Sequence, residues 1–347
     1  MIETVLLNRP IFFQPNRVWR LYTGGELLDR FVGNPAPKDD HFPEDWLAST
    51  TVAVNAEHQQ SPTEGVSRVR MPDGSDGPLF NEILPEGTNV LCKFLDSAVR
   101  LPIQCHPDKE FARKYYHSEH GKTESWIILA TRRINDQEPY LLMGFKPDVD
   151  KQKFITAVKE QDIGTMESML HKLPVQPGET YFIPGRFPHA IGSGVMLLEV
   201  QEPTDWVVQP ERFCAGFELS DADMWGPLDP EIAMECFDYR GETKEEILER
   251  LLMRPKILQQ TDAAILESII GPETTDCFVI ERLTIKPNSK FTYESRGQHL
   301  GIVTSGQGSI ESDVIKQGDR FFISNQLKTL TYNVEHQLVI YIIKAPQ

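Results

Sequence analysis

Short apolar segments separated by Gly, Pro, Asn and Asp dominate the chain from residue 79 onward. Segments of this length, bounded by turn-forming residues, are typical of β-strands. The clearest examples before residue 205 are NVLCKFLD, ESWIILA, PYLLMGF, TYFIP and VMLLEVQ. Their even spacing predicts a β-sandwich or β-barrel in this part of the protein.

Two stretches instead place apolar residues three and four positions apart, as an amphipathic helix does. Residues 150–173 have this pattern and predict two short helices divided at Gly164. Residues 229–272 contain TKEEILERLLMRPKIL and TDAAILESII, and the first of these opens with a Thr and two Glu residues that favour a helix start. We therefore expect a helical connector over residues 229–272.

Strand-like segments return after Pro272 and continue to the end of the sequence, as in CFVIERLTI, KFTYES and QLVIYIIK. They predict a small all-β unit over residues 273–347. Its segment GDRFFIS resembles GETYFIP of the first unit, so the two units are interpreted as distant internal repeats. Only the first unit continues to a histidine, His189, and we expect only this unit to bind a metal.

Charge and composition exclude several classes of function. The 347 residues include 51 acidic and 35 basic side chains, which gives a formal net charge of -16. Such a surface repels a phosphate backbone, so we expect no nucleic-acid partner. No apolar run approaches the roughly 20 residues that cross a bilayer, and no secretion signal is recognisable at the start. The five cysteines form no C-x-x-C pair. We expect a cytoplasmic protein with no membrane contact.

The candidate chemistry begins at QCHPD, residues 104–108. Alternate side chains of a strand share a face, so Gln104 and His106 should point the same way and Cys105 into the core. Glu124 follows in GKTE and His189 in PGRFPHA. A single histidine is more often a core or loop residue than a ligand, so the prediction depends on all four residues together. Two imidazoles, a carboxylate and an amide suit zinc, but iron, manganese, nickel and cobalt accept similar ligands.

The order of these motifs resembles a known enzyme family. A Q-x-H followed by Glu, and a Gly-strand-Pro-Gly segment followed by His, are similar to the two metal motifs of the cupin barrels. More narrowly, LPIQCHPDK, GKTESW, PGRFPHAIG and LEVQ resemble the signature blocks of type I mannose-6-phosphate isomerases in their short bacterial form. The resemblance implies a mainly β fold of two cupin-like β-barrel (jelly-roll) units joined by a helical connector. The expected boundaries are 1–228, 229–272 and 273–347.

By this resemblance, one zinc ion per chain has four ligands: Gln104, His106, Glu124 and His189. Lys93 and Lys122 match active-site lysines of the family. The implied reaction interconverts mannose 6-phosphate and fructose 6-phosphate by moving a proton between C1 and C2. Lys122 is the candidate base for this proton transfer. The expected partner is a small sugar phosphate, and the expected assembly is a monomer or a homodimer.

One position departs from the family pattern. Where the family has an arginine four residues after an Asp, this chain has Gln209. Arg212 lies three residues later and is the candidate to replace that arginine in catalysis. Together with Lys93, Lys122 and Arg186, it is expected to bind the phosphate group.

Two other functional classes fit the same residues. Iron held by this nitrogen and oxygen ligand set can activate oxygen, as it does in other cupins. The arginine lost at Gln209 would also suit a metal-binding cupin that acts on another sugar, or a sugar-binding homologue without catalytic activity.

Overall fold

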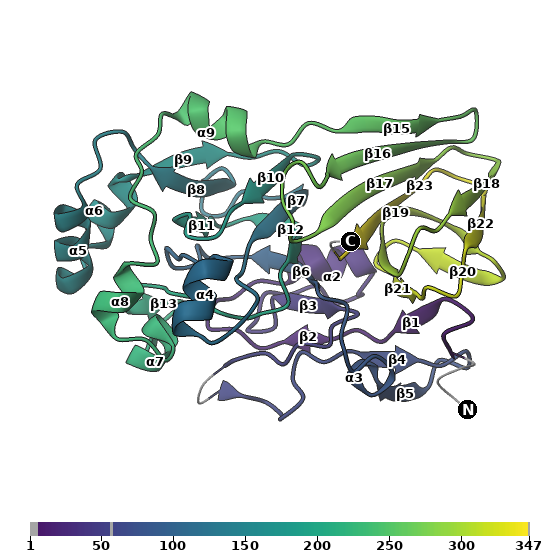
Figure 1. Cartoon of the computed structure of the whole chain (residues 1–347), viewed down its shortest axis with the longest axis horizontal. Helices are drawn as coiled ribbons and strands as arrows, with labels where there is room; N and C mark the ends of the chain where they lie inside the picture. Colours follow the sequence, from purple (N-terminus) through teal and green to yellow (C-terminus); the bar gives the residue numbers. More distant parts are fainter. Residues whose placement is uncertain (1–5, 56–57, 346–347) are drawn as a thin grey trace.

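Antiparallel β-sheets organise the protein in the computed structural model, which describes residues 6–55 and 58–345 (Figure 1). Strands account for 38% of the residues and helices for 16%, which confirms the expected mainly β fold. Two β units lie side by side along the longest axis. The first unit occupies the left half of Figure 1 and the second unit the right half.

Two sheets build the first unit. The larger sheet has the strand order β10-β7-β12-β6-β3-β2, and a three-stranded sheet has the order β11-β8-β9. The strands of the larger sheet are β2 (Arg17–Val18), β3 (Glu44–Leu47), β6 (Leu91–Ser97), β7 (Glu124–Thr131), β10 (Thr180–Ile183) and β12 (Val195–Gln201). Those of the smaller sheet are β8 (Tyr140–Phe145), β9 (Leu170–Pro174) and β11 (His189–Ile191).

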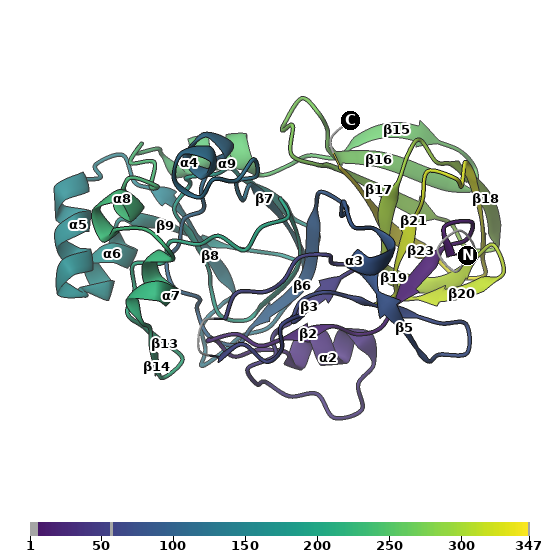
Figure 2. The same cartoon turned by 60° about the horizontal axis from the view of Figure 1, so that its bottom comes forward.

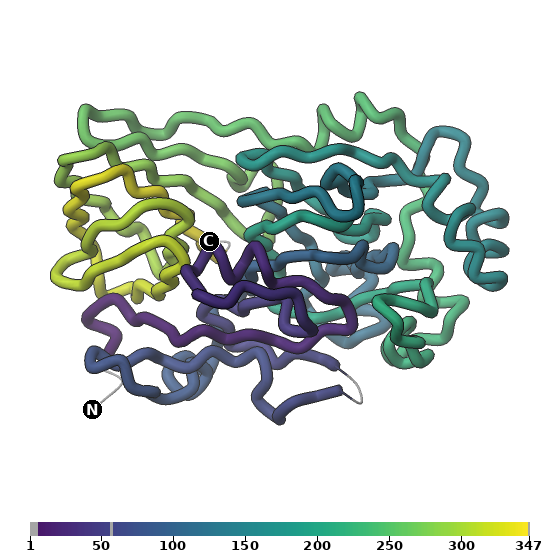
Figure 3. The backbone as a smooth tube through the Cα atoms, turned by 180° about the vertical axis from the view of Figure 1, so that it is seen from behind, coloured from purple at the N-terminus to yellow at the C-terminus, as the bar shows by residue number. Residues whose placement is uncertain are grey.

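A twelve-stranded sheet forms the second unit and also recruits three strands from the start of the chain. Its C-terminal strands are β15 (Lys256–Gln260), β16 (Ala264–Ile270), β17 (Val279–Ile285), β18 (Ser289–Glu294), β19 (His299–Ile310), β20 (Asp313–Lys316), β21 (Arg320–Ile323), β22 (Thr329–Val334) and β23 (Leu338–Lys344). The N-terminal strands are β1 (Ile11–Phe13), β4 (Arg68–Arg70) and β5 (Asp76–Leu79). Since β1 pairs with β21, the purple N-terminal segment runs beside the yellow C-terminal strands in Figure 3.

Helices and one small hairpin lie around these sheets, and α3 lies beside β5 of the second unit. The helices are α2 (Glu26–Val32), α3 (Phe80–Ile83), α4 (Lys109–Tyr115), α5 (Lys151–Glu160), α6 (Ile163–Ser168), α7 (Asp221–Trp225), α8 (Pro230–Met234) and α9 (Lys244–Leu251), and the hairpin is β13 (Phe213–Cys214) with β14 (Phe217–Glu218). Figure 2 shows α5, α6, α7 and α8 at the end of the first unit that faces away from the second. Two short helices in residues 150–173 are confirmed. They divide at Gln161, which adopts a φ of 53°, and Gly164 lies inside α6.

The expected helical connector is wrong in its second half. Helical structure ends at Leu251, and the segment TDAAILESII forms β16 instead of a helix. The isoleucines of this segment are β-branched and favour strands. The backbone of β17 also provides hydrogen-bond partners for it, because the two strands pair in antiparallel orientation. The expected boundary at residue 272 therefore falls between two strands that pair with each other.

Three large buried apolar clusters hold these layers together, besides a small one around Trp46. One fills the space between the two sheets of the first unit, and one lies inside the second unit. A third joins the units and receives Cys92 and Phe94 from β6 and Ile280 from β17. Because side chains alternate along a strand, the opposite face of β6 points into the first unit. The six-stranded sheet is thus covered on both faces.

A buried ion pair also connects the units. The guanidinium of Arg320 in β21 donates to the carboxylate of Asp45 in β3, and both side chains are less than 7% exposed. The other carboxylate oxygen of Asp45 accepts from the backbone N–H of Asn16 at 2.8 Å. A buried guanidinium that loses its carboxylate partner retains the desolvation cost of its charge.

We predict that Asp45→Ala lowers the free energy of unfolding by about 3 to 5 kcal/mol, because Arg320 is left buried without its partner. Urea denaturation measures this change. The matched control is Arg30→Ala, which removes an exposed pair with Glu26 and should cost less than about 1 kcal/mol. The double variant Asp45→Ala with Arg320→Met should recover part of the loss. An Asp45→Ala effect no larger than that of the control would contradict the prediction.

Candidate functional site

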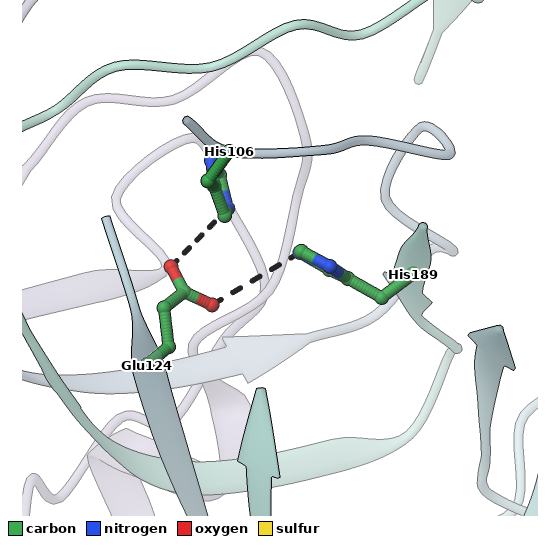
Figure 4. Close-up of side chains that lie close together, drawn as sticks. All are labelled: His106, Glu124 and His189. Atoms are coloured by element: carbon green, nitrogen blue, oxygen red, sulfur yellow. Dashed lines mark ion pairs between the residues drawn. The ribbon is translucent and has the colours of Figure 1, made fainter. Parts of the chain in front are cut away.

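Three side chains of metal-ligating type converge inside the first unit. His106 comes from the loop before α4, Glu124 begins β7 and His189 begins β11 (Figure 4). Glu124 lies between the two imidazoles, with Oε1 3.2 Å from Nε2 of His106 and Oε2 4.0 Å from Nε2 of His189. One ligand atom from each residue lies within 4.8 Å of the others. The structure brings these three predicted ligands together.

Hydrogen bonds fix the orientation of both imidazoles. Nδ1 of His106 lies 2.8 Å from the carbonyl oxygen of Trp206, and Nδ1 of His189 lies 2.7 Å from that of Phe187. A carbonyl only accepts, so each Nδ1 carries the hydrogen and each Nε2 offers a lone pair toward Glu124. Nε2 of His189 is buried without a hydrogen-bond partner among the described residues. A lone pair in this state fits a metal ion as its partner.

Burial keeps both imidazoles in the neutral form that binds metals. It lowers the pKa of His189 to about 3, with the neighbouring His106 as the second cause. Burial, followed by the charge of Lys122, also lowers the pKa of His106. Burial opposes ionisation of Glu124, but Lys122 and His106 outweigh it and hold the pKa of this carboxyl well below its usual value. The site therefore presents two neutral nitrogens and one carboxylate.

Gln104 is held beside His189 by the backbone. The two residues exchange both main-chain hydrogen bonds, with N–O distances of 2.8 and 3.0 Å. Gln104 also lines the same cavity as His106. Cys105 points into the core, as expected, and its Sγ lies 3.6 Å from that of Cys236. All five cysteines are buried and free.

Lys122 places a positive charge directly against these groups. Its Nζ lies 3.0 Å from Nε2 of His106 and donates to Oε1 of Glu124. The donor set therefore attracts a cation, here the lysine ammonium. Lys122 is 6% exposed and lines the cavity beside the site.

The cavity has a volume of 390 Å³, which is within the range of small-molecule sites. Gln104, His106 and Lys122 form one part of its wall. Aromatic side chains from other segments, including Trp19 and Trp206, form another part. A molecule in this cavity meets the candidate metal ligands and a large apolar surface at the same time.

Strand register brings further charged side chains to the cavity. Alternation along β3, β6 and β12 turns Glu44, Lys93 and Glu199 toward the inside of the first unit, and Lys93 lies directly opposite Glu199. Nζ of Lys93 is 3.3 Å from Glu199, 3.9 Å from Glu44 and 3.9 Å from Asp205. The predicted lysine thus reaches the pocket wall, surrounded by three carboxylates.

The buried charges shift one another's ionisation. Burial alone would lower the pKa of Lys93, but Glu199, Glu44 and Asp205 outweigh it and raise this pKa. Burial would raise the pKa of Glu44, but Arg20 and Lys93 lower it to about 2. Burial, with repulsion from Glu124, raises the pKa of Glu199 to about 7.

Arg20 is a pocket residue that the sequence reasoning did not identify. Its guanidinium pairs with Glu44 and Asp205, each at 3.1 Å, and donates to Asn55 at 2.7 Å. The roles of Glu44 and Asp205 were also missed. Asp205 lies four residues after the LEVQ block, so its position carried a usable signal, but Glu44 lies outside the matched motifs. Arg20 likewise falls outside every matched motif.

Two predicted arginines do not reach the pocket. Nη2 of Arg212 lies 2.7 Å from Asp221, and its Nη1 donates to the carbonyl of Leu219 at 3.1 Å. The guanidinium of Arg186 donates to the carbonyl oxygens of Glu235 and Cys236.

Gln209 itself lines the cavity. The expectation that Arg212 folds back into the missing arginine's place is wrong, because the segment from 210 onward turns toward the hairpin and α7. Arg212 is held there by the backbone, since its N–H donates to the side chain of Gln161 at 2.7 Å.

Known proteins support the resemblance indicated by the motifs. The chain is 26% identical over 200 residues to the mannose-6-phosphate isomerase ManA of Bacillus subtilis, a match that covers 58% of this chain and 60% of that protein. It is 32% identical over 206 residues to the mannose-6-phosphate isomerase of Streptococcus mutans, with 57% and 59% covered. The sequence matches therefore span less than two thirds of the relatives' length. No protein-family model matches the chain.

The likeness extends further in three dimensions. The crystal structure of the mannose 6-phosphate isomerase from Bacillus subtilis superposes with a TM-score of 0.71 at 18% identity, and covers 96% of this chain and 99% of that one. The chain therefore shares the fold of that isomerase over nearly its whole length. Within the described part of the chain, no helix is long and apolar enough to span a membrane.

We predict that His106→Ala and His189→Ala each lower the bound transition metal, expected at one ion per chain, by at least tenfold, because each removes one of two imidazole ligands. Elemental analysis of the purified proteins measures this. The control is His171→Ala, whose imidazole contacts the backbone oxygen of Glu242 and takes no part in the cluster. Full metal content in both test variants would contradict the site.

Proposed function

We propose that this protein is a zinc-dependent aldose-ketose isomerase that interconverts mannose 6-phosphate and fructose 6-phosphate in the cytoplasm. The observation that carries the proposal is the cluster of His106, Glu124 and His189, with Lys122 against it, beside a sugar-sized pocket. Relatives named mannose-6-phosphate isomerase support the choice of reaction and substrate.

Gln104, His106, Glu124 and His189 would hold the zinc ion. Two imidazole nitrogens and two oxygen donors are a set that zinc accepts. When bound, the metal would polarise the sugar carbonyl and stabilise the negative charge that develops on its oxygen.

Lys122 is the side chain proposed to move the proton. As the free amine it would take the proton from C2 of the open-chain aldose and return it to C1 of the resulting enediol. The hydroxyl proton on O2 would pass to O1 in the same conversion, so that the atoms balance and no other reactant is needed. Its Nζ lies on the pocket wall, 3.0 Å from the imidazole of His106, so a substrate held at the metal ligands would lie within its reach. The surrounding aromatic side chains, Trp19 and Trp206 among them, would shield the reacting carbons of a bound sugar from water.

One observation favours a second candidate function. Gln209 lines the pocket and is neutral, whereas the family pattern has an arginine at this position. The loss of this positive charge would suit a protein that binds a sugar without turnover.

Formation of fructose 6-phosphate from mannose 6-phosphate, followed in a coupled assay on protein of measured zinc content, separates the two functions. The isomerase proposal expects turnover that disappears when a chelator removes the metal and returns with zinc. Binding of the sugar without turnover would support the second candidate.

We predict that Lys122→Ala lowers kcat by about 10²- to 10⁴-fold, the usual contribution of a general base. Steady-state kinetics with mannose 6-phosphate measures the change, and elemental analysis checks that zinc is retained. Arg212→Ala should change kcat/KM by less than about threefold, because its guanidinium is bound outside the pocket. The reverse ranking of these two variants would show that Arg212, not Lys122, serves the reaction.

A further inference from the structure

Arg20 is the one arginine that lines the pocket among the described residues, and it belongs to none of the matched motifs. It lies two residues after β2, and its side chain is 11% exposed. Its guanidinium carbon is 5.2 Å from the centre of the Trp46 ring, a favourable distance for a cation over an aromatic ring. An arginine side chain is not deprotonated in proteins, so this buried cation needs partners of opposite charge.

The N–H groups of this guanidinium are directed to three segments of the chain. Nε lies 3.1 Å from Oε1 of Glu44 in β3, and Nη2 lies 3.3 and 3.1 Å from the two carboxylate oxygens of Asp205. Nη1 donates to the side chain of Asn55 at 2.7 Å and to the carbonyl oxygen of Val54 at 3.5 Å. Asp205 in turn accepts from the backbone N–H of Val54 at 3.0 Å. Arg20 therefore ties two carboxylates and a loop segment into one wall of the pocket.

Without Arg20, three carboxylates would surround one lysine. Nζ of Lys93 lies within 3.9 Å of Glu44, Glu199 and Asp205. An ammonium group carries one positive charge, so Lys93 alone balances one of these three negative charges. Arg20 pairs with Glu44 and Asp205 and leaves Glu199 as the nearest partner of Lys93, at 3.3 Å.

The ionisation of Glu44 shows the same dependence. Its carboxylate accepts from the hydroxyl of Tyr22 at 2.6 Å and from the indole N–H of Trp46 at 2.7 Å. Burial would raise the pKa of Glu44, but the charges of Arg20 and then Lys93 outweigh it and lower this pKa to about 2. Arg20 thus keeps Glu44 in the form that only accepts hydrogen bonds.

No neighbouring arginine duplicates this role in the described part of the chain. Gln209 is neutral, and its Nε2 donates to the backbone oxygen of Asp223 at 2.9 Å. Arg186 and Arg212 are bound outside the pocket. The fixed positive charge opposite Asp205 therefore comes from Arg20.

The carboxylates that Arg20 holds can contact a sugar. Glu44 and Asp205 line the cavity that Gln104, His106 and Lys122 also line. Carboxylate oxygens accept hydrogen bonds from hydroxyl groups, which a sugar carries on most of its carbons. Two acceptors in fixed positions would set the angle at which the sugar meets Lys122. A displacement of about 1 Å can lower a rate by about 10²-fold, so turnover depends on where these carboxylates are held.

We infer that Arg20 is a positioning residue of the isomerase site, which fixes the carboxylates of Glu44 and Asp205 where they accept hydrogen bonds from the hydroxyl groups of the sugar. Arg20 acts through these two side chains and takes no part in the proton transfer. This role rests on the proposed isomerase function and assigns to it a residue outside the matched motifs.

Steady-state kinetics with mannose 6-phosphate on the zinc-loaded, full-length protein tests this role. Arg20→Gln removes the charge and should lower kcat/KM by about 10²-fold with unchanged zinc content. Arg20→Lys keeps the charge but loses the planar fork, and should lower kcat/KM by about tenfold. The matched control is Arg17→Gln, whose guanidinium binds Asp29 and the carbonyl oxygen of Phe42 and does not line the cavity. It should change kcat/KM by less than about threefold.

The outcomes separate this role from the isomerase function itself. If kcat/KM of Arg20→Gln stays within about threefold of the wild type, the role of Arg20 is overturned and the isomerase function stands. A wild-type protein without turnover overturns both. If Arg20→Gln does not fold, as judged by thermal unfolding, Arg20→Lys decides, and a kcat/KM equal to that of the wild type overturns the role.

The pH dependence of kcat/KM distinguishes positioning from a loss of stability. A neighbouring cation lowers the pKa of a carboxyl by about 1 to 3, so Arg20→Gln should raise the pKa of Glu44. Glu44 then takes up a proton at a higher pH, and the acidic limb of the profile should move upward by at least about one pH unit. Arg20→Lys keeps the cation and should leave the limb in place. The same acidic limb in both variants would show that Arg20 only supports the fold, and the positioning role would be rejected.

Discussion

Burial of charge on the inner face of the six-stranded sheet is the constraint on which the rest of the site depends. Glu44, Lys93 and Glu199 are each less than 5% exposed. A charge taken out of water destabilises the fold unless a partner of opposite charge and further hydrogen bonds compensate for it. Removing one member of a buried ion pair typically lowers the free energy of unfolding by about 3 to 5 kcal/mol. The register of β3, β6 and β12 supplies these partners, because it sets Lys93 opposite Glu199 and next to Glu44. The scaffold thus decides which charges remain available to a ligand.

The apolar clusters packed on the two faces of this sheet fix the register of its strands. Cys92 and Phe94, on either side of Lys93 in β6, pack into the cluster that joins the two units. A slip of one residue would turn Lys93 into that apolar layer and Phe94 into the pocket, so both faces oppose it. The second unit therefore contributes to the site without touching it, since its strands form the other side of this layer.

Sequence reasoning identified the parts of the site that lie in short motifs and missed those that depend on tertiary structure. His106, Glu124 and His189 occur in recognisable segments, and the fold brings them together. Arg20 pairs with Asp205, 185 residues away, and no local pattern encodes such a contact. The helix expected for TDAAILESII was wrong because the segment fits both periodicities and the open edge of β17 decides between them. Arg212 is close to Gln209 in sequence, but this closeness did not indicate that the backbone carries Arg212 away from the pocket.

The pairing of charge in the pocket limits how substrate binding can assist the chemistry. An enzyme normally uses contacts with remote, non-reacting parts of its substrate to stabilise the transition state. Here a remote phosphate would compete with Glu44 and Asp205 for Arg20 and with Glu199 for Lys93, so little of its binding energy would remain. Stabilisation must then come from groups at the reacting end, where His106, Glu124 and His189 converge and Lys122 lies against them.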